Sequence, residues 1–210
     1  MSQSTRTRLL NAAVYRYGRD GFHRTATARV AADAEVSTGT LFRHFPSLEE
    51  LVLAAYHCAT QQLDGHWTGR PSRTTAYDHV RGRWEAALES ALAAPDAFRY
   101  YALYNATPGY GATPRSWDPP ANPVGGRWAP WRTLGPFLAR ASGEPAGRTD
   151  LLARVLEAQW TVTVEMLLLH GTLSLKPEAR ALAARLFDGW WTMVGLDRTA
   201  PFPSDVSAEG

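Results

Sequence analysis

The sequence predicts an all-α protein in which a small three-helix N-terminal domain precedes a larger helical domain. Apolar residues recur at intervals of three and four residues in almost every segment, as amphipathic helices require. The chain of 210 residues is long enough to bury a substantial core. The helical pattern pauses at residues 107–127, which are rich in proline and glycine, and we expect a long loop there. The sequence leaves open whether that loop is a lid.

The composition excludes several classes of protein. Cys58 is the single cysteine, so no internal disulfide can form. The start of the chain has no signal-peptide pattern, and no apolar run approaches a membrane span, so we expect a cytoplasmic protein with no membrane partner. No glycine-rich phosphate loop, nucleophile elbow or zinc motif is found. We therefore expect no enzyme, no cofactor and no metal site.

Charge is distributed unevenly along the chain. Residues 1–45 hold seven arginines against three acidic residues, a net charge of +4, whereas the whole chain carries only +2 and the remainder therefore −2. A basic N-terminal domain on a mildly acidic body favours contact of one end with phosphate. On charge alone, a solvated surface is an equal alternative.

The N-terminal helices follow from apolar spacing and from helix-end residues. Residues 5–19 place apolar side chains on one face, and Gly21 is the expected stop. Phe22 should pack into the core, and Thr25 or Thr27 should start the next helix.

Two short helices with a tight turn are predicted within residues 25–45. Apolar positions begin at Val30 and resume on a second helical face at Leu41, and Ser37 stands where an N-cap is needed. Residues 38–40 form helices poorly, so local stability does not explain their presence. A first turn of small, hydroxylated residues can lie against a flat polar surface such as the major groove of DNA.

Several separated motifs lie in register between about residues 5 and 60. They are Leu9-Leu10-x-Ala12-Ala13, Gly21-Phe22-x-x-Thr25, Val30-Ala31, Val36-Ser37-x-Gly39-Thr40-Leu41-Phe42-x-His44-Phe45 and Glu49-x-Leu51. Together they resemble the N-terminal domain of the tetracycline-repressor (TetR) family. The resemblance implies a helix-turn-helix domain in a transcriptional regulator, most often a repressor.

The resemblance also implies which residues bind DNA. Thr38, Thr40 and Phe42 would face the groove or its walls. Arg43 would hold the DNA backbone, and Arg29 or Arg43 could contact guanine. The alternative is that these side chains have no DNA-binding role and serve only as helix caps and solvent-exposed surface. By the same resemblance, Thr25, Ser37 and His44 would also hold the DNA backbone, and Thr27 completes the DNA-binding set.

Four positions depart from the family's usual pattern. Ala26 replaces Ser or Thr, Glu35 replaces the turn glycine, Leu48 replaces a phosphate-binding lysine, and Phe42 lacks the hydroxyl of the common tyrosine. Ala26, Glu35 and Leu48 motivate an alternative function, a helical small-molecule receptor or sequestering protein without operator binding.

Ser47 and Glu50 form a capping-box pattern that starts a connecting helix over residues 47–64. We expect a helix-turn-helix DNA-binding domain at residues 1–46. A ligand-binding and dimerisation domain should occupy residues 47–200, and a loose C-terminal tail should follow at residues 201–210.

The larger domain should contain helices at residues 75–93, from Pro95 to Tyr104, at 130–141, and at 149–169 and 176–196. The last two are apolar on two sides: in the first of them, one stripe contains Leu151, Val155, Val162, Met166 and Leu169, and the second contains Leu152, Leu156, Trp160, Val164 and Leu167. The final helix likewise has Leu182, Leu186, Trp190 and Val194 on one side and Ala179, Ala183, Phe187 and Trp191 on the other. A second copy of the same two helices would cover the outer faces, as a four-helix bundle in a homodimer.

Eight tryptophans are the other unusual feature of the composition. Most should fill the core or a dimer interface. As a group, the large aromatic side chains of the larger domain favour a pocket for a small apolar or aromatic effector, with polar contacts from Glu165 or His170. A helical enzyme that uses this cavity is a weaker alternative. The candidate pocket residues are Trp84, Tyr104, Trp128, Trp131, Trp160 and Glu165.

From these observations we expect a TetR-like homodimer that binds a palindromic operator in double-stranded DNA and is released by a ligand. The identity of the effector, the operator, the regulated genes and the sign of regulation do not follow from the sequence.

Overall fold

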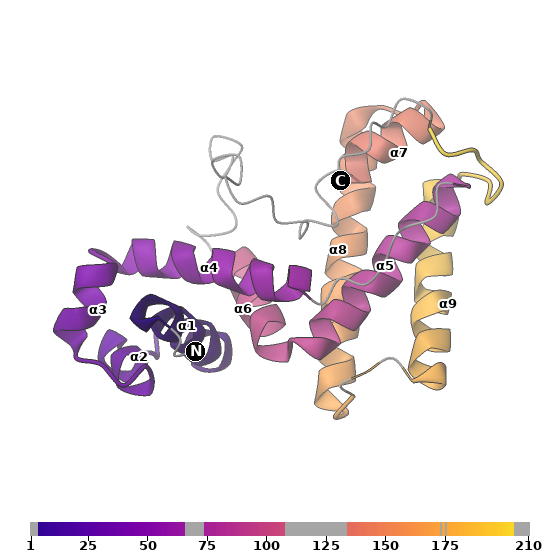
Figure 1. The fold of residues 1–210 in the computed structure, drawn as a ribbon. Helices are drawn as coiled ribbons and strands as arrows, with labels where there is room; N and C mark the ends of the chain where they lie inside the picture. The colour runs from indigo at the N-terminus through magenta and orange to yellow at the C-terminus, as the bar shows by residue number, and fades with distance from the viewer. Residues whose placement is uncertain (1–3, 66–73, 108–133, 173, 175, 204–210) are drawn as a thin grey trace. The chain divides into compact units, whose positions relative to one another are not determined.

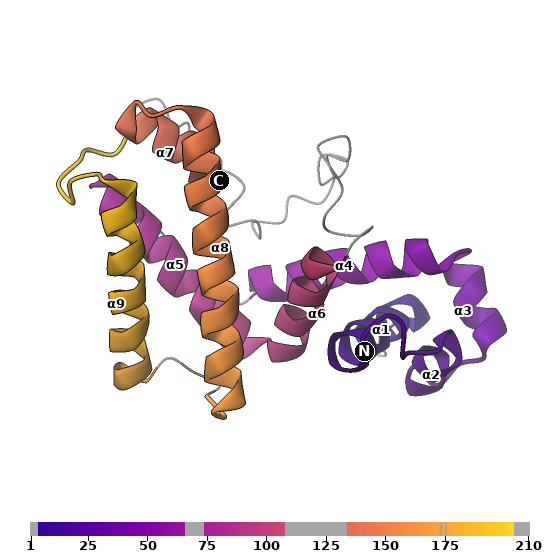
Figure 2. The same ribbon diagram turned by 180° about the vertical axis from the view of Figure 1, so that it is seen from behind.

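The computed structural model describes residues 4–65, 74–107, 134–172, 174 and 176–203 (Figures 1 and 2). Within these ranges the regular elements are α-helices, apart from an isolated bridge between Thr75 and Pro201, so the predicted all-α class is confirmed. None of the described helices is both long enough and apolar enough to cross a membrane. The helices are α1 (Thr5–Asp20), α2 (Thr27–Asp33), α3 (Thr38–His44), α4 (Leu48–Gly65), α5 (Ala76–Ala93), α6 (Pro95–Ala106), α7 (Leu134–Ser142), α8 (Ala146–Leu169) and α9 (Pro177–Val194).

The helices pack into two compact units. The N-terminal unit contains α1 to α4 together with α6, and the C-terminal unit contains α5 and α7 to α9. The helix that begins at Pro95 is expected from the sequence in the larger domain, whereas its packing groups it with the first four helices. The functional boundary between residues 46 and 47 stays a prediction.

Helix α6 belongs to the N-terminal unit because α1 allows it to approach closely. A Cβ atom at Gly18 would lie 3.1 Å from both the Asp96 carbonyl oxygen and the Tyr100 backbone nitrogen. The Tyr100 hydroxyl donates to the carbonyl oxygen of Val52 on α4 at 2.8 Å. Gly18 is therefore needed for close packing of α1 against α6. The sequence alone shows only a glycine near the end of a helix and does not reveal this role.

The helix ends predicted at Gly21, Ser37 and Ser47 are confirmed. Gly21 terminates α1 with φ of 82°, a conformation that favours glycine, and its N–H donates to the Tyr17 carbonyl at 2.9 Å. Ser37 caps α3, and the Ser47 hydroxyl accepts the Glu50 N–H at 3.1 Å at the start of α4. Short-range hydrogen bonds therefore fix where α1 ends and where α3 and α4 begin.

A bidentate ion pair joins α1 to α2. The guanidinium of Arg16 donates to both carboxylate oxygens of Asp33, with 2.9 Å between Nη2 and Oδ1. The hydrogen bond and the positive charge of Arg16 hold the pKa of Asp33 below its ordinary value.

This ion pair should make the stability of the N-terminal unit dependent on pH. Because the folded-state pKa of Asp33 is depressed, its stabilising contribution is present above about pH 4 and is lost as pH falls through the lowered pKa. Thermal unfolding of the wild type and of Asp33→Asn should therefore differ at neutral pH and converge on acidification. A difference that stays constant down to about pH 2 would contradict this assignment.

The C-terminal unit is built around α8, which packs against α5, α7 and α9. Its buried face carries Leu156, Trp160 and Val164, all with no exposed surface. Hydrogen bonds also join α8 to α9: the Trp190 Nε1–H donates to the Leu152 carbonyl at 2.9 Å, and the Gln159 amide donates to the Leu186 carbonyl at 2.7 Å. The pairing of the last two helices is therefore specific as well as apolar.

The outer face of α8 is apolar and exposed. Val162 and Met166 are 58% and 50% exposed, and Leu151, Val155 and Leu169 continue the same stripe. On α9 the exposed apolar side chains are Leu182 and Met193. Leu182, Trp190 and Val194 are expected from the sequence to form one apolar stripe on α9. Leu182 is exposed, whereas Trp190 and Val194 are buried within the unit, so the three residues do not form one exposed face.

The segment after α9 is held against α5 and α7. The Ala76 N–H donates to the Ala200 carbonyl at 2.9 Å, and the Phe202 ring packs on His79 and Phe137. The described part of the expected loose tail, residues 201–203, is therefore packed, and residues 204–210 lie outside the described residues.

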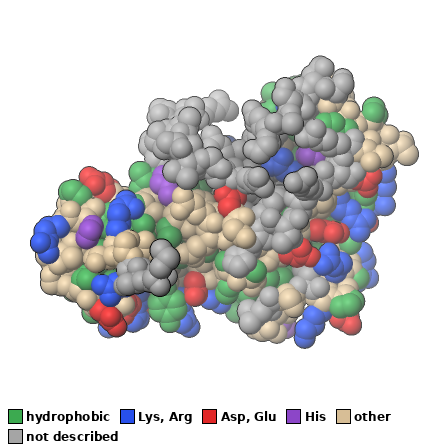
Figure 3. All heavy atoms as spheres, viewed as in Figure 1, with side chains coloured by type: hydrophobic (Ala, Val, Ile, Leu, Met, Phe, Trp, Pro, Cys, Tyr) green, Lys and Arg blue, Asp and Glu red, His purple; other side chains and the backbone are tan. Residues whose placement is uncertain are grey.

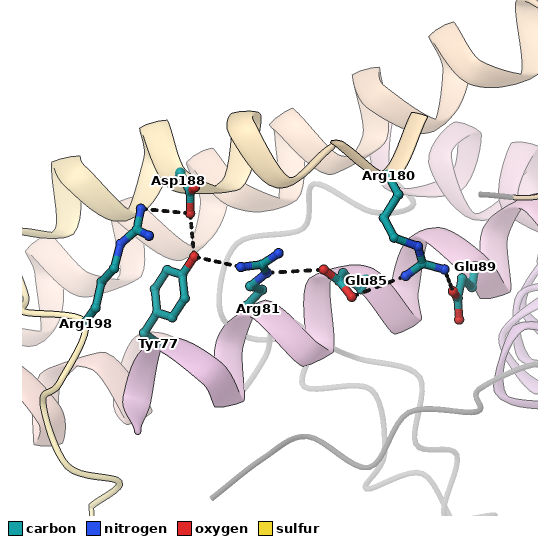
Figure 4. A network of polar contacts seen from close by, with 7 residues as sticks. All are labelled: Tyr77, Arg81, Glu85, Glu89, Arg180, Asp188 and Arg198. Atoms are coloured by element: carbon teal, nitrogen blue, oxygen red, sulfur yellow. Dashed lines mark hydrogen bonds and ion pairs between the residues drawn. The ribbon is translucent and has the colours of Figure 1, made fainter. Parts of the chain in front are cut away.

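Polar side chains add a network between α5, α9 and this segment (Figure 4). The Tyr77 hydroxyl donates to Asp188 Oδ1 at 2.5 Å, and the guanidinium of Arg198 pairs with the same carboxylate oxygen at 3.1 Å. On the next turns of α5, the chain of ion pairs continues through Arg81, Glu85, Arg180 and Glu89.

Candidate DNA-binding surface

The exposed edge of α3 carries a chain of hydrogen-bonded side chains. Ser37 Oγ accepts the Thr40 N–H at 3.1 Å and lies 3.1 Å from Thr40 Oγ1. Arg43 Nη2 donates to Thr40 Oγ1 at 2.9 Å. Residues three apart share one face of a helix, so the three side chains stand in a row. The row orients the Arg43 guanidinium on the outer side of α3, where it can donate to a phosphate.

The opposite face of α3 anchors the helix in the core. Leu41 and Phe45 are buried, and the Arg6 guanidinium lies 4.9 Å from the centre of the Phe45 ring. In contrast, Phe42 is 41% exposed, and Arg43 and His44 are exposed as well. The helix therefore turns its charged and aromatic side chains outward.

Gly39 lies in the first turn of this outer face. A Cβ atom there would meet only Ser37 Oγ, at 3.8 Å, so the described chain gives no steric reason for a glycine. Glycine inside a helix costs about 1 kcal/mol relative to alanine. The residue is explained if another molecule approaches the α3 backbone closely.

The residues of the DNA-binding set on and before α2 are less uniformly exposed. Arg29 is exposed and Thr27 half-buried. Thr25 is only 7% exposed, and among the described residues its hydroxyl has no hydrogen-bond partner. Thr25 must therefore change rotamer before its hydroxyl can contact a phosphate.

Basic side chains gather on this unit. Figure 3 shows Lys or Arg and His side chains at its left end, where Figure 1 places α3. Arg8 and Arg16 are paired with Glu35 and Asp33, respectively, which leaves Arg43 as an exposed cation beside Thr40. Arg43 is thus the exposed cation of α3, with the exposed His44 beside it.

The positions that depart from the family pattern have visible structural consequences. Ala26 starts α2 without a side-chain cap, and Leu48 is 37% exposed at the start of α4. Glu35 adopts φ of 55°, a conformation that glycine occupies more easily. The turn between α2 and α3 nevertheless forms, with the Val36 N–H donating to the Ala31 carbonyl at 3.0 Å.

The residues predicted to line an effector pocket fall in different places. Trp84 and Trp160 are fully buried in the C-terminal unit. Tyr104 belongs to the N-terminal unit, where it stacks on Tyr56 with ring centres 4.2 Å apart. Glu165 is exposed on α8, beside the outer apolar stripe. The remaining candidates, Trp128 and Trp131, lie outside the described residues, as does most of the expected loop at 107–127.

Sequence reasoning missed the contacts that position the side chains predicted to bind DNA. The spacing of Ser37, Thr40 and Arg43 was the available signal for their hydrogen-bonded row. No comparable signal pointed to Arg6, because its contact with Phe45 joins residues far apart in the sequence.

The geometry of α2, the turn and α3 defines a helix-turn-helix domain. Comparison with known proteins agrees: residues 9–55 match the profile described as "Bacterial regulatory proteins, tetR family". The HTH-type transcriptional regulator UidR of Escherichia coli (strain K12) is 42% identical over 53 residues, which are 25% of this chain and 27% of UidR. The chain thus matches about a quarter of that relative's length.

Solved structures share the fold over most of the chain. A putative tetR family transcription regulator from Shewanella sp. PV-4 has a TM-score of 0.70 at 24% identity, with 90% of this chain and 98% of the other covered. A TetR family transcription regulator from Marinobacter aquaeolei VT8 has a TM-score of 0.62 at 21% identity, with 90% and 94% covered. Residues 9–55 thus match the N-terminal domain of TetR-family bacterial regulators, and the solved structures show that the chain as a whole shares the fold of such regulators.

Proposed function

We propose that this TetR-family protein is a repressor that binds a palindromic operator as a homodimer and is released by a small effector. The observation that carries the proposal is the outer face of α3, where Gly39 leaves the backbone open and Ser37, Thr40 and Arg43 form a polar row. Donors of this kind suit the phosphates that flank a major groove. The protein would act in the cytoplasm, where its operator is accessible.

The homodimer is supported by the outer apolar faces of α8 and α9. Leu151, Val162 and Met166 are each at least half exposed, as is Met193 of α9. A contiguous exposed apolar surface of this kind favours association, and a two-fold axis would bring the same stripe of a second copy against it. Two α3 helices would then enter successive major grooves about 34–36 Å apart.

In this mechanism, the effector binds the C-terminal domain and favours a dimer with a different spacing of the two α3 helices. The effector changes operator occupancy only if it binds the two dimer forms with different affinity. A difference of about 1.4 kcal/mol in its binding free energy shifts the equilibrium between the forms tenfold. Trp84 and Trp160 remain the proposed aromatic contacts, and the effector would be small and apolar or aromatic.

A mobility-shift experiment on the DNA that flanks the protein's own gene tests operator binding. We expect a shifted band at low salt that is lost when the palindrome is scrambled. Unaltered migration across the whole region would instead favour a small-molecule receptor without operator binding, the function to which Ala26, Glu35 and Leu48 would point.

Gly39→Ala should separate DNA binding from folding. Alanine is the better helix former by about 1 kcal/mol, and the added methyl meets only Ser37 Oγ, so the thermal stability should be maintained or raised. The same methyl would stand between α3 and the DNA, so operator affinity should fall by roughly tenfold or more. Thermal melting and fluorescence anisotropy measure the two effects.

Gly147→Ala, at an open position in the first turn of α8, is the control that should leave DNA binding unchanged. Full operator affinity in Gly39→Ala would contradict the proposed approach of DNA to α3.

A further inference from the structure

Arg83 is a half-buried arginine near the middle of α5. Its Nε is buried and has no hydrogen-bond partner, and no ion pair is formed by Arg83 among the described residues. Burial lowers the pKa of Arg83, and no neighbouring acid opposes that effect. Arg81, two residues earlier, is also partly buried, but Tyr77 and Glu85 raise its pKa on balance.

The acidic residues of α5 are turned away from Arg83. Glu85 accepts from Arg81 and Arg180, and Glu89 accepts from Arg180 at 2.5 Å (Figure 4). A step of two residues rotates a helix position by roughly 200°, so Arg83 lies on nearly the opposite side from Arg81 and Glu85. The network of Figure 4 therefore cannot neutralise the Arg83 guanidinium without unwinding α5.

The face of α5 that carries Arg83 consists mainly of apolar or small side chains, with His79 one turn earlier. Ala76, Val80, Ala87 and Ser90 lie within one or two turns on this face, and all four are fully buried. The other ionisable side chain on this face is that of His79, and its ring stacks on Phe137 with 5.0 Å between ring centres. A half-buried guanidinium in such surroundings is unfavourable unless an anion satisfies it.

We propose that Arg83 is the recognition residue for the carboxylate of an apolar monocarboxylic effector, a proposal that rests on the effector-binding role proposed above. The planar guanidinium can donate two parallel hydrogen bonds to a carboxylate. A single arginine matches a single negative charge, and the apolar core beside it favours a ligand with an apolar body. On binding, the carboxylate of the effector would replace the water around the half-buried Arg83 guanidinium.

Matched acid and amide probes test the proposal directly. Isothermal titration calorimetry without DNA would compare decanoate with decanamide and 1-naphthoate with 1-naphthamide. We expect at least one acid to bind the wild type roughly tenfold or more tightly than its amide, as the loss of a charge-assisted pair predicts. Arg83→Gln should abolish this preference, whereas Arg140→Gln, at an exposed arginine of α7, should retain it.

The ligand-free protein provides a second, independent test. Arg83→Met removes a buried charge and keeps an apolar stem, so its melting temperature should equal or exceed that of the wild type. If Arg83→Met instead lowers the melting temperature, the guanidinium is paired within the chain and the proposal fails. Equal binding of acids and amides, or no binding of any acid, would also overturn it.

Operator binding is measured separately, so the two proposals can fail independently. An acid that binds through Arg83 but leaves the operator complex intact would support the carboxylate site and contradict release by this effector. If an acid releases the operator but no acid binds through Arg83, the carboxylate site is wrong. Release of the operator would then depend on another part of the protein.

Discussion

Val162→Glu is expected to dissociate the proposed dimer and to weaken operator binding by about 10²–10⁴-fold. Val162 is 58% exposed at the centre of the apolar stripe of α8, with Met166 on the next turn. In a two-fold dimer each substitution would bring two carboxylates into the interface, where desolvation and mutual repulsion oppose association. A monomer holds only one half-site, so the gain from simultaneous engagement of two α3 helices is lost.

Light scattering after size-exclusion chromatography would measure the oligomeric state, and fluorescence anisotropy the operator affinity. Gln61→Glu is the matched control, because it adds the same charge at an exposed position of α4 in the N-terminal unit. That variant should remain dimeric and bind the operator nearly as well as the wild type. A dimeric Val162→Glu protein would show that the α8 stripe is not the interface.

Arg43→Ala is expected to weaken operator binding by about 1.5–3 kcal/mol per half-site, the usual range for a hydrogen bond to a charged group. The Arg43 guanidinium is exposed and oriented by Thr40, so its removal leaves α3 folded but deletes the cation. Because one phosphate contact is lost in each half-site, the slope of log affinity against log salt should decrease by about 2.

Thr40→Ala should weaken binding in the same direction with little change in the salt dependence, because threonine is neutral. Both variants should stay dimeric, and Arg140→Ala, which removes an exposed arginine of the C-terminal unit, should leave the salt slope unchanged. Dissociation of the dimer in either α3 variant would contradict the proposed division of labour between the two units.

Much of the fold could be predicted because it depends on neighbours in the sequence. Ser37 caps α3 and Gly21 ends α1 through hydrogen bonds that span three or four residues. The all-α class follows from apolar spacing, and the family resemblance rested on motifs within residues 5–60 that the comparisons support. These features can be inferred without knowing which helices meet.

Contacts between distant residues were less accessible to sequence reasoning. Tyr104 was grouped with Trp84 as a pocket residue, yet the two lie in different units because Gly18 admits α6 to the face of α1. Arg83 attracted no attention in the sequence, where it is one arginine among several. Its isolation becomes visible only when Glu85 and Glu89 are seen to pair with other arginines.

The sequence by itself determined the helices, their caps and the helix-turn-helix domain, since these depend on interactions over a few residues. The tertiary structure decided which apolar faces are covered, which charges are paired and how Arg43 is held. Burial and ion pairing depend on side chains that meet only after the helices pack. That is the physical reason why Trp190 is buried while Met193, three residues later on the same helix, is left exposed.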